Sequence, residues 1–263
     1  KDIGPDSLPR RRLAYDELLA SQLALGLVRA QYRRRPGRVI KGDGHLRQKA
    51  LAALPFSLTS SQTKAVGEIL ADMADPARML RLLQGDVGSG KTVVALLGLL
   101  NAVEAGSQAA LMAPTEILAR QHMATIDPLA RAAGITVVLL TGREKGKTRE
   151  AVLAGLASGE TALCVGTHAL FQDDVIFHDL AFAVVDEQHR FGVHQRLMLA
   201  GKGAGTDVLV MTATPIPRTL TLAAFGDLDV SRLTENPPGR KPVETRALPL
   251  SSLGQVIERI AAK

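Results

Sequence analysis

The stretch that decides the fold lies between two apolar runs, Leu80–Leu83 and Val93–Leu100, and reads Gly85-Asp86-Val87-Gly88-Ser89-Gly90-Lys91-Thr92. The flanking runs predict a buried strand that turns into a helix. The glycines let the backbone curl so that successive N–H groups face one point, beside the positive end of the helix dipole. A loop of this kind binds a nucleoside triphosphate, with the lysine on the β- and γ-phosphates and the threonine hydroxyl on Mg²⁺. A chance match is disfavoured because strand and helix are both predicted.

Short apolar runs alternate with helix-like segments from Phe56 to about Glu235. The runs, each a predicted strand, are Leu80–Leu83, Ala109–Met112, Thr136–Leu140, Ala162–Val165, Phe182–Val185 and Val208–Met211. The segments with helical spacing are Val93–Glu104, Glu116–Ala133 and Lys147–Ala157. Uniformly apolar strands between helices predict an α/β fold with a mainly parallel sheet covered on both faces. Ligands of such sheets bind at the carboxyl ends of the strands, so we expect the polar motifs to converge at one edge.

The rest of the chain divides into segments before and after this alternation. We expect a helical linker over residues 1–55, with one amphipathic helix over 12–34 that stops at Pro36-Gly37. The main domain is expected over residues 56–236. Residues 236–240 (NPPGR) predict a linker, after which 243–249 is expected to be a strand and 253–262 a helix. The pattern stops at Lys263, so we expect the part over 237–263 to be a truncated second unit.

Charge and composition restrict the function only loosely. The net charge of +6, from 32 basic and 26 acidic residues, is compatible with a polyanionic partner but is not diagnostic. The basic clusters are Arg10–Arg12, Arg33–Arg35 and Lys145–Arg149, and solvated helix ends are the favoured account of the arginine triplets. Aromatic residues make up 3% of the chain and Trp is absent, which argues against a base-stacking platform.

Cysteine usage and hydropathy indicate the compartment. The single cysteine, Cys164, excludes an internal disulfide framework, suits a reducing cytoplasm and is expected to be a buried structural thiol. Charges interrupt each apolar segment before 18 residues, so we expect no membrane span. We also expect no signal peptide.

Two carboxylates end the apolar strand at 182–185. In a protein with a phosphate-binding loop, Asp186 is expected to hold Mg²⁺ through water, and Glu187 to activate the attacking water as a general base. An Asp-Glu pair after a strand is by itself a weak signal, usually a solvated turn. Together with the loop about one hundred residues earlier it predicts both halves of one active site.

Further polar segments are weaker signals. Thr212-Ala213-Thr214-Pro215 follows the last strand, where hydroxyls could contact neighbouring carboxylates or simply start a helix. Gln62 lies in a helix that Thr59 is expected to cap, and its amide could read an adenine edge. The loops at 113–116, 141–147 and 166–168 expose backbone N–H groups and lysines suited to a nucleic-acid backbone, although ordinary helix caps explain each almost as well.

Taken together, these segments resemble the superfamily 2 helicases, and more narrowly the RecG-type ATP-dependent DNA helicases. The matching segments are 85–92 (GDVGSGKT), 113–122 (APTEILARQH), 141–147 (TGREKGK), 166–172 (GTHALFQ), 186–196 (DEQHRFGVHQR) and 211–220 (MTATPIPRTL), with further likeness at 12–25 and 226–243. The resemblance implies a RecA-like lobe that binds ATP and Mg²⁺ and acts on branched or duplex DNA. A transcription-repair coupling translocase also has TATPIPRT, but carries Glu-Gln where this chain has Gln188-His189.

The resemblance also implies roles for single residues. Lys91 and Thr92 hold phosphates and Mg²⁺, Asp186 and Glu187 handle metal and water, and Gln62 recognises adenine. The residues that relay the nucleotide state to DNA are His189, Thr212 and Thr214. Those that grip the DNA backbone are Thr115, Arg120, Lys145, Lys147, Thr167 and His168.

Helicases of this kind use a second RecA-like lobe, which supplies an arginine finger, and the family carries an N-terminal wedge domain for branched DNA. Neither is found in this sequence, so we expect the lobe alone to unwind little. The alternatives are a nucleotide-binding module with little turnover until a second lobe docks, or a phosphate-loop kinase, disfavoured because no acceptor site or lid is found. A monomer is expected.

Overall fold

A computed structural model describes residues 4, 7–34, 37–186, 202–203, 205–213, 228–235 and 247–261. Within the first helix, the side chains of residues 21, 25 and 28–34 are not described, and neither is that of residue 171.

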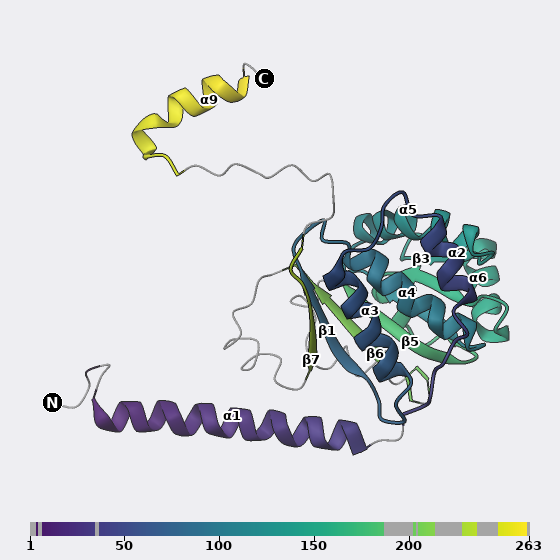
Figure 1. Cartoon of the computed structure of the whole chain (residues 1–263), viewed down its shortest axis with the longest axis horizontal. Coiled ribbons are helices and arrows are strands. Elements are labelled where there is room, and N and C mark those ends of the chain that lie inside the picture. The colour runs from purple at the N-terminus through teal and green to yellow at the C-terminus, as the bar shows by residue number, and fades with distance from the viewer. Residues whose placement is uncertain are drawn as a thin grey trace.

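The described residues form a central parallel sheet of seven strands in the order β3-β4-β2-β5-β6-β1-β7 (Figure 1). Its strands are β1 (Leu80–Gly85), β2 (Gln108–Met112), β3 (Val137–Leu140), β4 (Leu163–Gly166), β5 (Leu180–Asp186), β6 (Asp207–Thr212) and β7 (Asp229–Leu233). The six predicted strands and their parallel arrangement are therefore confirmed, and no end differs by more than two residues from its prediction. The edge strand β7, which pairs with β1, was not predicted, because its sequence DVSRL lacks the uniform apolar character of the others.

Helices cover the sheet and extend beyond it. Those in the described part of the chain are α1 (Leu8–Arg34), α2 (His45–Ala52), α3 (Ser60–Met73), α4 (Lys91–Glu104), α5 (Glu116–Ala132), α6 (Gly146–Ser158) and α9 (Leu253–Ala261), with the 3₁₀ turns η1 (His168–Phe171) and η3 (Leu250–Ser252). The predicted helices at 93–104, 116–133 and 147–157 are confirmed. None of the described helices is both long enough and apolar enough to cross a membrane.

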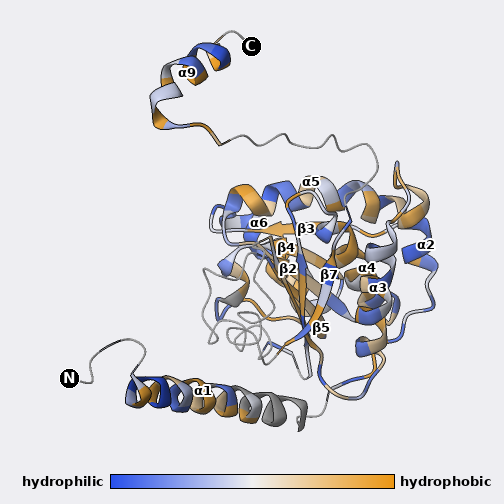
Figure 2. Cartoon of the chain, turned by 60° about the vertical axis from the view of Figure 1, so that its left-hand side comes forward, coloured by the Kyte–Doolittle hydropathy of each residue, from blue (hydrophilic) through white to orange (hydrophobic). Residues whose placement is uncertain are grey.

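Alternation of side chains along the strands produces an apolar core on each face of the sheet. Leu83, Leu111 and Val184 belong to the core under α2, α3, α4 and α5. Leu82 and Val185 point the other way, into a core that α6 and η1 help to close. Figure 2 shows the strands mostly in the apolar colour, between helices whose outer faces are polar. Burial on both faces is the reason that these strands read as continuous apolar runs.

Helix α4, which begins at the phosphate-binding loop, lies in the middle of the first core. Every residue from Val93 to Ala102 is buried, because the sheet covers one side and α2, α3 and α5 cover the other. Its Gly98 lets the ring of Phe182 approach so closely that a Cβ there would lie 3.0 Å from the ring. A helix that is apolar all round is stable only when enclosed in this way.

The segment before the main domain is partly integrated into it. Ile40 is 1% exposed, and Asn101 of α4 donates to the Ile40 carbonyl and accepts from Gly42 N–H. Helix α2 packs against α4. The predicted boundary at residue 55 stays a prediction, but residues 40–54 contribute core contacts that a linker would not make.

Helices α1 and α9 lie apart from the sheet (Figure 1). Helix α1 begins four residues earlier than predicted and ends at Arg34, and its Leu13 and Leu18 are exposed. The helix expected at 253–262 is confirmed as α9, which has no buried residues. The expected strand at 243–249 is not found at 247–249, and residues 243–246 lie outside the described part.

Asp207, the first residue of β6, is a buried carboxyl group at the edge of the sheet opposite the phosphate-binding loop. It is 0% exposed, its Oδ1 accepts from Met79 N–H at 2.8 Å, and its Oδ2 has no hydrogen-bond partner among the described residues. Burial raises the pKa of this carboxyl to about 8, and Asp72 adds to the rise while Arg78 and Arg38 oppose it. The folded state therefore keeps a proton that the unfolded chain loses near pH 4.

This difference predicts that the chain loses stability as the pH rises from about 4 to about 8, since folding then requires proton uptake. Asp207→Asn keeps an acceptor for Met79 and removes the titration, so it should flatten this slope and raise the free energy of unfolding at pH 8.5 by about 2 kcal/mol. Urea unfolding of both chains at pH 5 and pH 8.5 measures the effect. Equal losses in the free energy of unfolding between pH 5 and pH 8.5 in the two chains would contradict this prediction.

Candidate functional site

The carboxyl edge of the sheet brings the predicted motifs together. Parallel register places Gln84 opposite Thr212, and Asp186 opposite Met211. Met112 pairs with both Val185 and Gly166, so the loops after β2, β4 and β5 leave the sheet side by side. The expected convergence of polar motifs at one edge is confirmed.

The phosphate-binding loop has the backbone that its glycines predict. Gly88 and Gly90 have φ angles of 79° and 87°, and Gly90 precedes the first turn of α4. Asp86, Val87 and Gly88 form an exposed tip, while Ser89 is buried. Gly85 is required for packing, because a Cβ there would lie 2.5 Å from Ser89 Oγ and 2.9 Å from Leu233 Cβ. The loop therefore presents its backbone at the N-terminus of a helix, where anions bind.

The Lys91 side chain folds back over the loop. Its Nζ donates to the carbonyls of Gly85 at 2.6 Å and Asp86 at 3.0 Å. The ammonium thus lies on the loop that should surround a phosphate, and its predicted contact with the phosphates stays a prediction. To hold a phosphate it must exchange at least part of these carbonyl contacts for phosphate oxygens.

Gln62 connects α3 to the phosphate-binding loop. It is 0% exposed, its Nε2 donates to the Ser89 carbonyl at 2.8 Å, and its Oε1 accepts from Thr59 N–H at 2.9 Å. The second bond belongs to a capping box that Thr59 completes, which confirms the predicted cap. Adenine recognition by Gln62 stays a prediction, and in this conformation both ends of the amide are already engaged within the protein.

Glu235 contacts the first residues of α3. Sequence reasoning missed it, because it lies about 175 residues away from its partners. Ser60 donates its hydroxyl to this carboxylate, and Ser61 adds a backbone N–H bond of 3.1 Å. These hydrogen bonds lower the pKa of Glu235 to about 2. A negative charge at a helix N-terminus is favourable, so Glu235 fixes α3 next to the residue that holds the phosphate-binding loop.

Buried Asp186 and His122 form a polar group with half-buried Thr92 at the end of β5. His122 Nε2 lies 2.6 Å from Asp186 Oδ2, and its Nδ1 lies 3.4 Å from Thr92 Oγ1. A hydroxyl and a carboxylate oxygen are hard donors, which Mg²⁺ prefers while keeping several of its waters. One imidazole contacts both predicted Mg²⁺ ligands, which therefore lie on either side of a single ring, and their oxygen atoms are a donor set that fits that ion. Sequence reasoning did not single out His122.

Several predicted residues cannot be placed. Glu187, His189 and Thr214 lie outside the described residues. Thr212 is the last residue of β6 and is 3% exposed. Its predicted role in coupling stays a prediction.

The residues predicted to contact DNA differ in their exposure. Arg120, Lys145, Lys147 and His168 are exposed, and Thr115 is half-buried. The Thr115 hydroxyl caps α5 by accepting from Leu118 N–H at 3.3 Å. Thr167 is 4% exposed and its hydroxyl accepts from Ala169 N–H. In this conformation its side chain therefore caps the 3₁₀ turn η1, as the alternative interpretation predicts.

Ion pairs connect the start of α5 to the loop at 141–147. Arg120 lies 2.8 Å from Glu116 and 3.7 Å from Glu144, and Arg143 lies 3.0 Å from Glu116. Within the described part of the chain, Lys145 and Lys147 have no such acidic partner. Among the predicted DNA-binding residues, the two lysines are therefore the cations best placed to meet a phosphate backbone.

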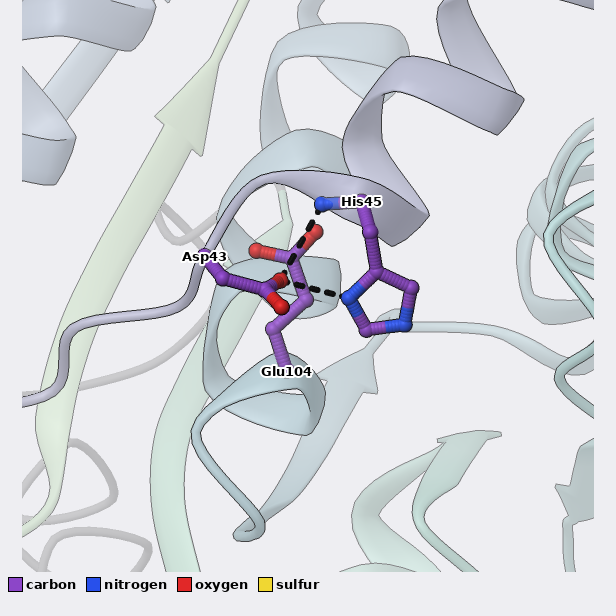
Figure 3. A group of neighbouring side chains, drawn as sticks. All are labelled: Asp43, His45 and Glu104. Carbon is purple, nitrogen blue, oxygen red and sulfur yellow. Dashed lines mark hydrogen bonds and ion pairs between the residues drawn. The ribbon is translucent and has the colours of Figure 1, made fainter.

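Asp43, His45 and Glu104 place three possible ligand atoms within 4.8 Å of one another (Figure 3). Glu104 is already saturated, since it accepts from Gly44 N–H at 3.0 Å, Arg47 N–H at 2.8 Å and Arg47 Nε at 2.9 Å. Its side chain is fully buried. A cation would have to displace the Arg47 guanidinium, so this group clamps α2 to the end of α4 and does not form a metal centre.

Cys164 is buried in β4, as predicted for a structural thiol. Burial raises the pKa of its thiol to about 12, so it stays protonated and unreactive at neutral pH.

Comparisons with known proteins show which families and folds the chain resembles. The DEAD/DEAH box helicase family model matches residues 59–222. ATP-dependent DNA helicase RecG from Pasteurella multocida is 48% identical over 255 residues, and RecG from Bacillus subtilis is 49% identical over 239 residues. These alignments cover 95% and 90% of this chain but 37% and 35% of the relatives, so the chain spans about a third of their length.

Solved structures show the same architecture. RecG bound to a three-way DNA junction has a TM-score of 0.84 and 45% identity across 95% of this chain and 34% of that chain. The DNA-bound helicase MrfA, at 19% identity, has a TM-score of 0.60 across 85% of this chain and 36% of that chain, which shows a shared fold alone. The predicted RecA-like lobe with its parallel sheet is confirmed.

The contact between Gln62 and the phosphate-binding loop makes Gly90 sensitive to substitution. A Cβ at Gly90 would lie 2.3 Å from Gln62 Nε2, on a backbone with φ of 87°. Gly90→Ala should therefore lower the free energy of unfolding by about 2 kcal/mol or more. Gln62→Ala should lower the free energy of unfolding by less in the Gly90→Ala chain than in the unmodified chain, since it removes the side chain that clashes with the new Cβ.

Gly67→Ala is the matched control for this prediction, because a Cβ at Gly67 meets nothing within 4 Å and its backbone is helical. It should raise the free energy of unfolding by up to about 1 kcal/mol. Urea denaturation of the four variants measures all of these changes. Strict additivity of the Gly90 and Gln62 substitutions would contradict the proposed contact.

Proposed function

Because this chain belongs to the DEAD/DEAH box helicase family and is of the RecG type, we propose that it is the ATP-binding motor lobe of a DNA helicase that remodels branched DNA. The observation that carries the proposal is the meeting of Lys91, Thr92 and Asp186 at one edge of a parallel sheet. These residues lie at the ends of elements that the chain order separates and the topology brings together.

Each residue of the site has a separate task in this proposal. The N–H groups of the loop and Lys91 bind the β- and γ-phosphates of ATP. Thr92 and Asp186 hold Mg²⁺, which when bound neutralises charge on the phosphates. Glu187, one residue after β5, takes the proton of the attacking water. Gln62 and the loop beside it meet the adenine, which would favour ATP over GTP.

The present contacts of Lys91 bear on how tightly ATP binds. Its bonds to Gly85 and Asp86 carbonyls must be replaced, so the net gain is the difference between two sets of hydrogen bonds. Bonds from the ammonium to a polyphosphate are charge-assisted on both sides and are stronger than its bonds to neutral carbonyls, which are charge-assisted on the donor side alone. The exchange is therefore favourable, and we expect measurable binding by this chain without another lobe.

DNA would lie across the loops that follow β2, β3 and β4. Lys145 and Lys147 would neutralise phosphates, and the amino end of α5 at Thr115 would add backbone N–H donors. None of these contacts reads a base, so binding should be insensitive to sequence and sensitive to salt. The structure of RecG on a three-way junction supports branched DNA as the partner.

Turnover would need a second RecA-like lobe, which supplies an arginine finger, and branched DNA would need a wedge domain. The intact enzyme would act as a monomer in the bacterial cytoplasm, at the nucleoid. Similarity to RecG relatives at 48% and 49% identity favours this function over a transcription-repair coupling translocase. If the lobe is only a nucleotide-binding module, it will bind ATP and turn over little until a second lobe docks.

Mg·ATP binding tests the proposal directly. Lys91→Ala should reduce the affinity at least tenfold in calorimetric titration, because the main cation on the phosphates is lost. Lys64→Ala is the matched control, since Lys64 is an exposed lysine on α3 whose side chain is 78% exposed. No binding by the unmodified chain, or equal losses in both variants, would refute a phosphate site at Lys91.

Glu187→Gln tests the general base separately. The amide keeps the size of the side chain but cannot accept a proton, so ATP binding should persist while hydrolysis by the intact enzyme is abolished. Phosphate release measured in single-turnover experiments on the full-length protein decides the point. Retained turnover would mean that another group activates the water.

A further inference from the structure

His122 is the one described side chain that contacts both residues assigned to Mg²⁺. Its Nε2 lies 2.6 Å from Asp186 Oδ2 and its Nδ1 lies 3.4 Å from Thr92 Oγ1. The side chains of His122 and Asp186 are 11% and 9% exposed, so water competes little for this contact. Nothing in the phosphate-loop chemistry itself requires a histidine here.

The position of His122 on α5 is also informative. Ala119, Ile126 and Ala130 bury the same face of the helix against the sheet, and His122 takes the place of an apolar residue between them. A histidine enclosed among apolar neighbours needs partners for its ring nitrogens. Both nitrogens have partners, and both partners belong to the predicted nucleotide site.

The hydrogen-bond roles follow from the chemistry of the partners. An ionised carboxylate only accepts, so His122 Nε2 carries the hydrogen of the shorter bond. In the neutral ring Nδ1 then accepts, and the Thr92 hydroxyl donates to it. A hydroxyl whose hydrogen is held by a histidine keeps its lone pairs for a metal, while Asp186 Oδ1 is left for water or metal.

We propose that His122 is a positioning residue, which orients the Thr92 hydroxyl and the Asp186 carboxylate for Mg²⁺ and ties that site to α5. The inference rests on the proposed function, since it assigns Mg·ATP to the same residues. Helix α5 begins after Thr115, where DNA is expected, and about 10 Å of helix separates that end from His122. A change at the metal site therefore reaches the expected DNA-binding end through one rigid element.

The test compares ATP binding with and without Mg²⁺ by calorimetry, using magnesium chloride or EDTA. His122→Phe preserves the ring shape and removes both hydrogen bonds, so it should reduce the Mg²⁺-dependent gain in ATP affinity about tenfold and leave binding in EDTA unchanged. His122→Gln can still donate to Asp186 and should recover most of the gain. Ile126→Val is the control, because it loosens the same face of α5 without touching the site.

A second readout separates positioning from a merely structural role. In the unmodified chain, Mg·ATP should change the amide hydrogen exchange of the first two turns of α5. The change should be lost in His122→Phe and kept in Ile126→Val.

The outcomes are distinguishable. Absence of Mg²⁺-dependent ATP binding by the unmodified chain overturns the proposed function and this inference with it. Normal binding by the unmodified chain, with the same Mg²⁺-dependent gain in His122→Phe, overturns the inference alone. Equal losses of that gain in His122→Phe and Ile126→Val also overturn it, since packing would then explain the effect.

Discussion

Every strand of the described sheet runs in the same direction, and the carboxyl ends of β1, β2, β5 and β6 therefore lie side by side at one edge. A parallel sheet requires a crossover after each strand, and the crossovers here place helices on both faces. The loops that enter those crossovers carry the phosphate-binding loop, the start of α5 and Asp186. Because all of these loops leave the sheet at its carboxyl edge, they meet there and form the site.

Helix α4 extends from the site through the core, and both of its ends are held in place. Its first residue, Lys91, belongs to the phosphate-binding loop, and its last, Glu104, accepts from the Arg47 side chain and from the backbone N–H groups of Arg47 and Gly44. With both ends fixed and all its middle residues buried, α4 has little freedom to shift. A stationary helix N-terminus is what a preorganised phosphate site needs, because binding then spends little free energy on ordering the loop.

Several polar groups of the site are satisfied by one another before any ligand is considered, whereas Ser89 Oγ is buried without a hydrogen-bond partner among the described residues. Lys91 donates to loop carbonyls, Gln62 donates to Ser89, and His122 lies between Thr92 and Asp186. This mutual satisfaction stabilises the lobe, because buried unpaired groups cost about 1–3 kcal/mol each. It also means that a ligand of Lys91, Thr92 or Asp186 must exchange existing bonds, which links nucleotide binding to small movements of α3 and α5.

The sequence by itself determined six of the seven described strands and the helices between them, and it indicated the ligand class. Apolar runs buried on both faces identify parallel strands locally, and the glycine spacing of 85–92 implies a phosphate loop whatever surrounds it. Strand β7 was not predicted, because its sequence, DVSRL, contains no apolar run. Only the tertiary structure decided which polar groups meet. His122 lies 64 residues from Asp186 and Glu235 lies 174 from Ser61, so no local period connects them. The order of strands in the sheet joins these pairs, and it is set by packing over the whole core. The same packing buries Thr167 and Gln62, whose residue types alone suggested surface contacts.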